Sequence, residues 1–155
     1  MTAYEVRVAE DEADRAACFA VRRQVFVVEQ RVSEDIEYDA YDAGALHVLA
    51  VGPRGPLGTG RLLHGPGTLA RTGGADIGSL GRLAVTAEAR GLGVGAALVR
   101  AIEEAARERG LTAVDLHAQT HALGFYQRLG YEAYGPEFPD AGIAHQAMRR
   151  VLRRP

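Results

Sequence analysis

The sequence predicts one mixed α/β domain in the order strand, helix, three strands, helix, strand, helix and C-terminal strands. A length of 155 residues and a hydrophobic content of 47% are typical of one globular domain with a single core. The hydrophobic period also switches repeatedly between that of a strand and that of a helix. Because no repeat, linker or low-complexity segment interrupts the chain, we expect a single domain over residues 1–155.

The N-terminal segment predicts a strand followed by a helix. Residues 4–8 alternate apolar and polar side chains, which is typical of a half-buried strand. Asp11 is a good N-cap residue, and apolar residues at helical spacing follow it as far as Phe26. Cys18 is the single cysteine and has no Cys-x-x-Cys partner, so we expect a buried apolar role for it.

The middle of the chain predicts a meander of strands. Residues 29–42 have neither period, and we expect a loop with a short helical turn after Ser33. Residues 46–51 and 57–63 then favour two strands around the Gly- and Pro-containing turn at 52–55. A third strand is expected from about residue 75 to residue 85.

The second half predicts two helices and the remaining strands. After Thr86 the apolar residues from Val94 to Ala105 lie on one helical face, and Gly110 stands where a C-terminal cap belongs. A short strand is expected over 113–116, a short helix over 121–129, and a final strand over 143–152.

The turn Arg90-Gly91-Leu92-Gly93-Val94-Gly95 opens the long helix and carries the chemistry of a phosphate site. Glycines let backbone N–H groups approach a ligand, and the free N–H groups at a helix start attract phosphate oxygens. A P-loop is excluded because the chain has no lysine, and a dinucleotide fingerprint would need its glycines directly after a first strand.

Together with two flanking segments, this turn resembles the acyl-CoA signature of the GNAT superfamily of N-acetyltransferases. Leu83-Ala84-Val85 precedes the turn, and Phe125-Tyr126-Gln127-Arg128-Leu129-Gly130-Tyr131 follows about thirty residues later. The family pattern is Gln/Arg-x-x-Gly-x-Gly/Ala and then Phe-Tyr-x-x-x-Gly-Phe/Tyr, and both halves match in order and spacing. The resemblance implies a GNAT fold, with a mixed, mostly antiparallel central sheet flanked by helices.

The resemblance also implies the reaction and the site. An acetyl group would move from acetyl-CoA to a primary amine of a small molecule or peptide, by direct attack in a ternary complex. The strand at 83–85 would pair with pantetheine, polarise the thioester carbonyl and splay from the strand at 114–117. Tyr126 would protonate the departing thiolate. Gln119 stands where the family commonly has asparagine and keeps the amide. The implied cofactor-binding residues are Leu83, Ala84, Val85, Arg90, Gly91, Leu92, Gly93, Val94, Gly95, Gln119, Phe125 and Tyr126.

The general base is the least determined part of the site. Residues 78–82, where some family members have a carboxylate, contain none. Glu29, at the end of the first helix, is the first candidate; His145, His47 and a water relay are the others. His117 and His121 have a metal-ligand spacing, but they fall on different elements without a third ligand, so we expect no metal.

Charge and hydropathy limit the partners. The formal net charge of -2 and the scattered arginines predict no nucleic-acid partner. No apolar run approaches membrane-spanning length, and the N-terminal residues do not resemble a signal peptide, so a cytoplasmic location is expected. The family resemblance suggests a homodimer. Six acids within residues 29–42 suggest a cationic acceptor: Glu29, Glu34, Asp35, Glu37, Asp39 and Asp42.

Two other functions remain open at this point. The chain could be a non-catalytic acyl-CoA-binding sensor with a vestigial acceptor cleft, or a nucleotide-phosphate binder that only mimics the signature. Turnover separates an enzyme from a sensor. A thermal shift with CoA, but with neither ATP nor NAD, separates both from a nucleotide binder.

Overall fold

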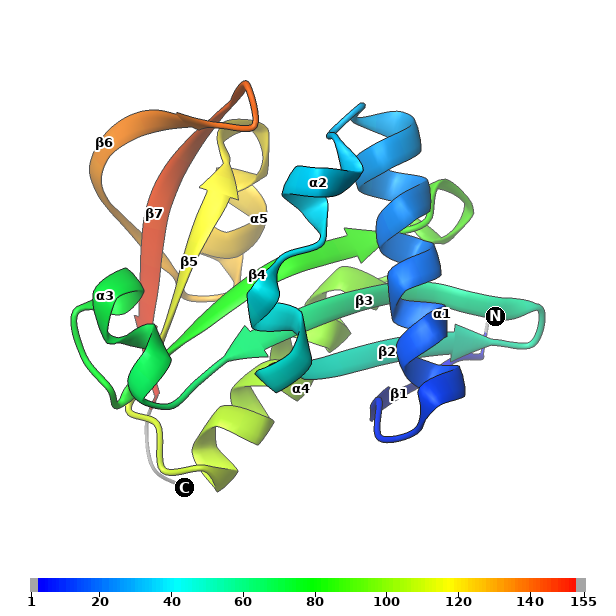
Figure 1. The fold of residues 1–155 in the computed structure, drawn as a ribbon, viewed down its shortest axis with the longest axis horizontal. Coiled ribbons are helices and arrows are strands. Elements are labelled where there is room, and N and C mark those ends of the chain that lie inside the picture. Colours follow the sequence, from blue (N-terminus) through cyan, green and yellow to red (C-terminus); the bar gives the residue numbers. More distant parts are fainter. Residues whose placement is uncertain (1–2, 153–155) are drawn as a thin grey trace.

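A computed structural model describes residues 3–152, apart from the side chains of residues 35 and 36, and its centre is a seven-stranded sheet (Figure 1). The strand order is β1-β2-β3-β4-β5-β7-β6, and every neighbouring pair is antiparallel except β4 and β5. This confirms the predicted mixed, mostly antiparallel sheet. The strands are β1 (Glu5–Val8), β2 (Leu46–Gly52), β3 (Gly55–Leu63), β4 (Ile77–Val85), β5 (Ala113–Gln119), β6 (Glu132–Asp140) and β7 (Ile143–Val151).

Helices cover both faces of the sheet: α1 and α2 lie on one face, and α4 lies on the other (Figure 1). No helix within residues 3–152 has the length and apolar content needed to span a membrane. The helical elements are α1 (Glu12–Arg22), the π-helix η1 (Arg23–Glu29), α2 (Glu34–Glu37), η2 (Ala40–Gly44), η3 (Pro66–Thr68), α3 (Leu69–Thr72), η4 (Ala87–Ala89), α4 (Val94–Glu108), η5 (Thr120–Ala122) and α5 (Leu123–Arg128).

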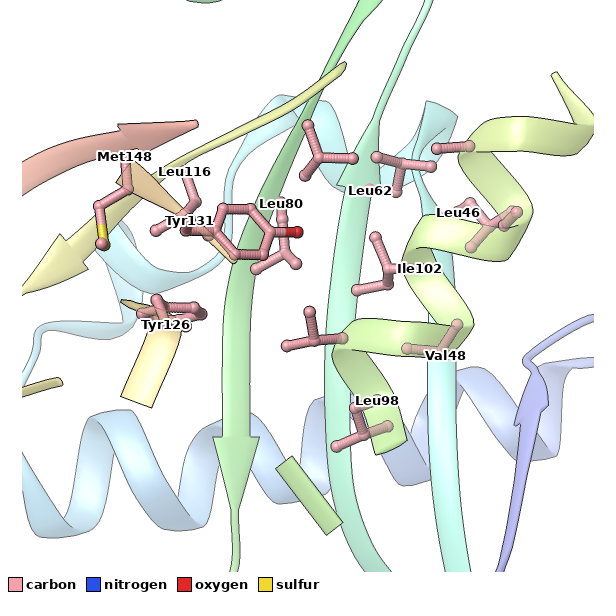
Figure 2. Close-up of a cluster of buried hydrophobic side chains, with 14 of the residues drawn as sticks. Leu46, Val48, Leu62, Leu80, Leu98, Ile102, Leu116, Tyr126, Tyr131 and Met148 are labelled. Carbon is pink, nitrogen blue, oxygen red and sulfur yellow. The ribbon is translucent and has the colours of Figure 1, made fainter. Parts of the chain in front are cut away.

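The main core lies between α4 and the sheet. Leu98 and Ile102 are fully buried and point from α4 toward the strands (Figure 2). A Cβ atom added at Gly60 on β3 would come within 2.8 Å of Ile102 Cδ1, so this glycine allows the helix to pack closely. Full burial of such a side chain contributes about 1.5–3 kcal/mol. Gly110, in the left-handed region at φ +74°, ends the helix as expected.

The first helix starts as predicted but ends differently. Asp11 caps α1, since its Oδ1 accepts a hydrogen bond of 2.7 Å from the Asp14 N–H. The periodicity predicts one continuous α-helix, whereas the last seven residues form the π-helix η1. A π-helix is wider because each N–H reaches one residue further back, as Gln30 N does to Val25 O at 3.1 Å. Apolar spacing alone does not distinguish it from an α-helix over so short a stretch.

Other predictions hold with local differences. The hairpin at 52–55 is confirmed by the Gly52–Gly55 pairing, and Cys18 is fully buried. β4 begins at Ile77 and not at about residue 75, because Ala75 and Asp76 form a turn after α3. The sequence did not locate β6, whose residues are almost all exposed and include two prolines and a glycine. It is an edge strand, where such residues are tolerated and no alternation is required.

Two irregularities in β4 shape the centre of the sheet. Its pairing with β5 covers Ile77 to Leu80 and then stops, so the two strands diverge toward their C-terminal ends (Figure 1). This confirms the predicted splay. Its pairing with β3 contains a β-bulge, where Arg82 adopts a φ of +52°. A bulge re-aims the side chains of its strand, and a left-handed arginine is a strained one.

Candidate functional site

The divergence of β4 and β5 opens a cleft with a volume of about 730 Å³. Its walls come from η1, β4, the turn before α4, β5, α5 and the β6–β7 turn. One backbone N–H of β4 faces the cleft. Thr86 N donates to Leu57 O on β3, and successive N–H groups of a strand point to opposite sides. The N–H of Val85 therefore points away from β3, into the cleft. The lining includes Val25, Phe26, Gln30, Arg61, Arg71, Arg82, Leu83, Ala84, Val85, Arg90, Gly91, Gly93, Val94, Gly95, His117, Gln119, Phe125, Tyr126 and His145.

The glycine turn meets the cleft at the C-terminal end of β4. Gly91 and Gly93 have φ values of +82° and +81°, which glycine adopts without strain. Gly93 is the N-cap of α4, so the first N–H groups of that helix have no partner one turn earlier and are free for a ligand. Gly95 has another constraint, because a Cβ there would lie 3.2 Å from Phe125 Cζ. The turn therefore fits a phosphate or pyrophosphate group.

Arg90 joins this turn to two neighbouring elements. Its Nε donates to Val85 O at 3.1 Å, and its Nη2 donates to both carboxylate oxygens of Glu29 at 3.0 and 2.9 Å. Glu29 ends η1 and does not belong to the residues that line the cleft. The two side chains are partly exposed, so solvent weakens their ion pair.

Tyr126 and Phe125 extend from α5 into the cleft. Tyr126 is 8% exposed, and its hydroxyl forms no hydrogen bond with any described residue. Burial raises the pKa of this phenol well above its ordinary value. The side chain is therefore protonated at neutral pH and has a hydroxyl available at the cleft.

Gln119 and Gln30 form a reciprocal amide pair between β5 and the end of η1. Gln119 Nε2 donates to Gln30 Oε1 at 2.9 Å, and Gln30 Nε2 donates to Gln119 Oε1 at 3.3 Å. His121 Nε2 also donates to Gln119 Oε1, at 2.7 Å. Both glutamines line the cleft, so the pair connects its two sides. The sequence singled out Gln119 but not Gln30, because they lie far apart in the chain.

Of the four histidines considered, His117, His121 and His145 line the cleft and His47 does not. His145 Nδ1 lies 2.7 Å from Ile143 O, and since a carbonyl only accepts, Nδ1 carries the hydrogen. In the neutral ring, Nε2 therefore keeps its lone pair. Burial lowers the pKa of His117, with smaller contributions from nearby charges. His47 is buried beneath α1, with Nε2 3.0 Å from Asp42 O.

A buried ion-pair network lies next to the cleft. Arg22 donates to Glu37 and Asp42, with an Nη1–Oδ1 distance of 2.7 Å to Asp42. Arg61 donates to Asp42 at 2.9 Å, and Arg82 Nε lies 3.0 Å from Glu37 Oε2. Arg22 and Arg61 are almost completely buried, so these carboxylates compensate charges that water does not reach.

This network corrects the interpretation of the acidic stretch at 29–42. Glu37, Asp39 and Asp42 bind arginines inside the molecule, and Glu29 binds Arg90. Glu34 forms an exposed ion pair with Arg23, and the side chain of Asp35 lies outside the described residues. The stretch is therefore not an open acidic surface for a cationic acceptor. Spacing along the sequence could not reveal this, because Arg22, Arg61 and Arg82 come from three other elements.

Burial and pairing shift the pKa values in this network in opposite directions. Burial raises the pKa of Glu37, and its arginine partners only reduce that rise. At Asp42 burial also opposes ionisation, but the hydrogen bonds and charges of Arg22 and Arg61 lower its pKa overall. Among the described residues there is no group of three or more His, Cys, Asp or Glu side chains that could hold a metal ion.

Comparisons with known proteins agree with this geometry. Residues 63–152 match the family model described as "Acetyltransferase (GNAT) domain". The chain is 38% identical to YyaT of Bacillus subtilis (strain 168) over 146 residues, covering 92% of this chain and 93% of YyaT. It is 34% identical to the uncharacterized N-acetyltransferase YjcF of the same organism, covering 92% and 96%. The crystal structure of an acyl-CoA N-acyltransferase from Pseudomonas aeruginosa is similar, with a TM-score of 0.78, 30% identity and coverage of 97% and 99%.

Proposed function

Because this chain belongs to the GNAT family of acetyltransferases, whose co-substrate is an acyl-CoA, we propose that it acetylates a primary amine of a small molecule or peptide. The donor is acetyl-CoA, and the amine attacks it directly in a ternary complex. One observation carries the proposal: the open edge of β4 joins the glycine turn to the unpartnered hydroxyl of Tyr126 within one cleft.

The residues of this cleft fit the parts of acetyl-CoA. The left-handed glycines and the free N–H groups of α4 suit the pyrophosphate, and Arg90 adds a positive charge beside them. The open edge of β4 at Leu83, Ala84 and Val85 suits the amides of pantetheine, which pair as a strand does. Val94, Phe125 and Gln119 also line the cleft and complete the proposed cofactor site; Leu92 is 46% exposed, does not belong to the lining, and stays a prediction.

We propose that the Val85 N–H donates to the thioester oxygen as negative charge develops there. The acceptor nitrogen forms a bond to the acetyl carbon, and the carbon–sulfur bond breaks. Tyr126 gives its proton to the departing sulfur, which suits a hydroxyl that is protonated and free of internal partners.

For the general base we favour His145 over Glu29. The ammonium form of the acceptor must lose a proton before attack; His145 lines the cleft, and because its Nδ1 donates to Ile143 O, Nε2 is the ring nitrogen that can accept this proton. Both oxygens of Glu29 already accept hydrogen bonds from Arg90, and Glu29 itself does not line the cleft. Glu29 stays a prediction that kinetics can test.

Release of free thiol from acetyl-CoA by the purified protein, measured across a panel of primary amines, tests the proposal. We expect amine-dependent release with at least one acceptor. Binding of CoA without release from any amine would instead support a non-catalytic sensor. A thermal shift with ATP but none with CoA would support a nucleotide-phosphate binder.

We also propose a homodimer formed through the C-terminal strands. β6 is an exposed edge strand, and its neighbour β7 carries Val151, which is 71% exposed. Exposed strand edges are sites where a second chain can pair. Sedimentation equilibrium tests this, and a monomer at micromolar concentration would contradict it.

A further inference from the structure

We propose that the amine acceptor carries a carboxylate, which binds in the cleft to Arg71, on the short helix that precedes β4, and to Arg82, on β4 itself. This inference rests on the proposed function and specifies its substrate class. It also reverses the expectation of a cationic acceptor.

Arg71 is the first observation that supports it. This residue lies on the short helix α3, lines the cleft, and forms no ion pair with any carboxylate that the structure describes. Its guanidinium lies over the Tyr41 ring, 5.4 Å from the centroid. Burial is the main cause of the lowered pKa of His117 on β5, and the positive charge of Arg71 contributes to it, which is consistent with the two residues lining the same cleft. A guanidinium held over a ring keeps its N–H groups available for a planar anion.

Arg82 is the second residue that supports the proposal. It lines the cleft from the β4 bulge, with a strained φ of +52° and a side chain 22% exposed. Burial lowers the pKa of Arg82, and the positive charge of Arg61 lowers it further. The carboxylates of Glu37 and Asp39 do not restore the ordinary value. Glu37, Asp39 and Asp42 equal Arg22, Arg61 and Arg82 in number, so Arg71 adds a positive charge that this network does not balance.

Hydrogen-bond donors also exceed acceptors there. Arg61 lines the cleft and is 1% exposed, yet its Nε has no hydrogen-bond partner within the described part of the chain. The acids among the lining residues are Glu37 and Asp140, and Glu37 already accepts from Arg22 and Arg82. A buried donor without an acceptor is costly, so an incoming carboxylate would be favoured.

The order of elements separates this anion site from the phosphate site. α3 precedes β4 and the glycine turn follows it, so α3, which carries Arg71, and the glycine turn lie at opposite ends of one strand, with Arg82 between them on β4 (Figure 1). His117 and His145 line the wall along β5 and β7. An acceptor bound by its carboxylate near α3 would extend its amine along β4 toward the C-terminal end of that strand, where the thioester is proposed to lie beside Val85.

The experiment compares matched acceptors. Alanine, leucine and phenylalanine are each assayed beside their amides and decarboxylated amines, and ω-amino acids of two to six carbons beside the corresponding alkylamines. Aminoalkyl phosphonates form a further arm, which distinguishes a carboxylate from other anions. We expect kcat/KM for the best carboxylate acceptor to exceed that for its uncharged partner by roughly 10- to 100-fold, the effect of one hydrogen bond to a charged group.

Variants locate the site. R71Q should raise KM for the carboxylate acceptor roughly 10-fold or more and leave KM for acetyl-CoA unchanged, and R71K should restore part of the loss. R54Q, at the exposed β2–β3 turn, is the matched control and should change neither constant. Equal use of carboxylates and uncharged amines, or equal constants for R71Q and R54Q, would overturn the inference while leaving the proposed acetyltransferase intact.

Calorimetry gives a readout that does not depend on turnover. The same acceptors are titrated into the CoA-saturated protein, first wild type and then R71Q. Heat from carboxylate acceptors that disappears in R71Q supports the inference even if no acetyl group moves. If neither a carboxylate nor a phosphonate from the panel binds to the wild-type complex, the inference fails.

Discussion

Tyr126 and Tyr131 lie edge to face with ring centroids 5.9 Å apart, but their hydroxyls have different environments. Tyr131 Oη donates to Glu103 Oε2 at 2.8 Å in the core, and Glu103 also accepts from Arg100 and Arg150. The Tyr126 hydroxyl bonds to no described residue and belongs to the cleft lining. The pair therefore provides one structural phenol and one that is available to a substrate.

Y126F should lower kcat about 100-fold or more, because the proton for the leaving sulfur is lost, while CoA affinity changes little. Y131F is the matched control: it removes a buried hydrogen bond and should cost about 1–3 kcal/mol of unfolding free energy with kcat preserved. Steady-state kinetics and urea titrations on both variants measure this. Equal kcat losses in the two variants would remove Tyr126 from the chemistry.

Gly91→Ala should raise KM for acetyl-CoA, because a left-handed alanine costs about 1–2 kcal/mol and the turn would relax away from its phosphate-binding shape. Gly110→Ala provides the comparison at the other end of α4, with a similar φ of +74° and open space around the added Cβ. It should lower stability by a similar amount and leave KM unchanged. The idea is contradicted if CoA binding, measured by calorimetry, weakens equally in both.

H145Q and E29Q distinguish the two candidate bases. H145Q should lower kcat about 100-fold, since it removes the Nε2 lone pair from the cleft. E29Q should preserve kcat and lower KM for acetyl-CoA, because it frees Arg90 from its carboxylate partner. A large kcat loss in E29Q with normal kcat in H145Q would reverse the assignment.

Asp42→Asn should destabilise the fold by about 3–5 kcal/mol at pH 7, because it leaves Arg22 and Arg61 buried with less compensation. The pKa of Asp42 is lower when folded than when unfolded. Its ionic contribution is therefore complete above the unfolded value of about 3.9 and is lost as the pH falls through the folded pKa.

The difference in unfolding free energy between wild type and D42N should consequently shrink below about pH 4. Guanidinium titrations at pH 7 and pH 3 check this, with Glu104→Gln, whose side chain is 65% exposed, as a control expected within about 0.5 kcal/mol. Glu37 is present in both proteins, so its contribution, which has the opposite pH dependence because its pKa is raised, cancels in the difference between wild type and D42N. A difference that does not depend on pH would show that packing outweighs charge at Asp42.

Much of this fold could be predicted because its signals are local. The alternation of apolar and polar residues in β1, the amphipathic face of α4 and the cap at Asp11 each occupy consecutive residues, and the glycine turn is a contiguous motif. The features that the sequence did not predict depend on contacts between residues far apart in the chain. Gln30 with Gln119, and Arg22 with Asp42, are neighbours only after folding, and β6 has an edge position that leaves no hydrophobic period.

The four-residue pairing of β4 with β5 also predicts how amide hydrogens exchange with solvent. Amides that bridge these strands near Leu80 lie in the centre of a seven-stranded sheet and should exchange slowly. The Val85 amide, on the same central strand, faces no strand and should exchange as quickly as one at a sheet edge. A bound acyl-CoA that pairs with β4 would slow this amide selectively, so the middle of the sheet would acquire full protection only when the donor is present.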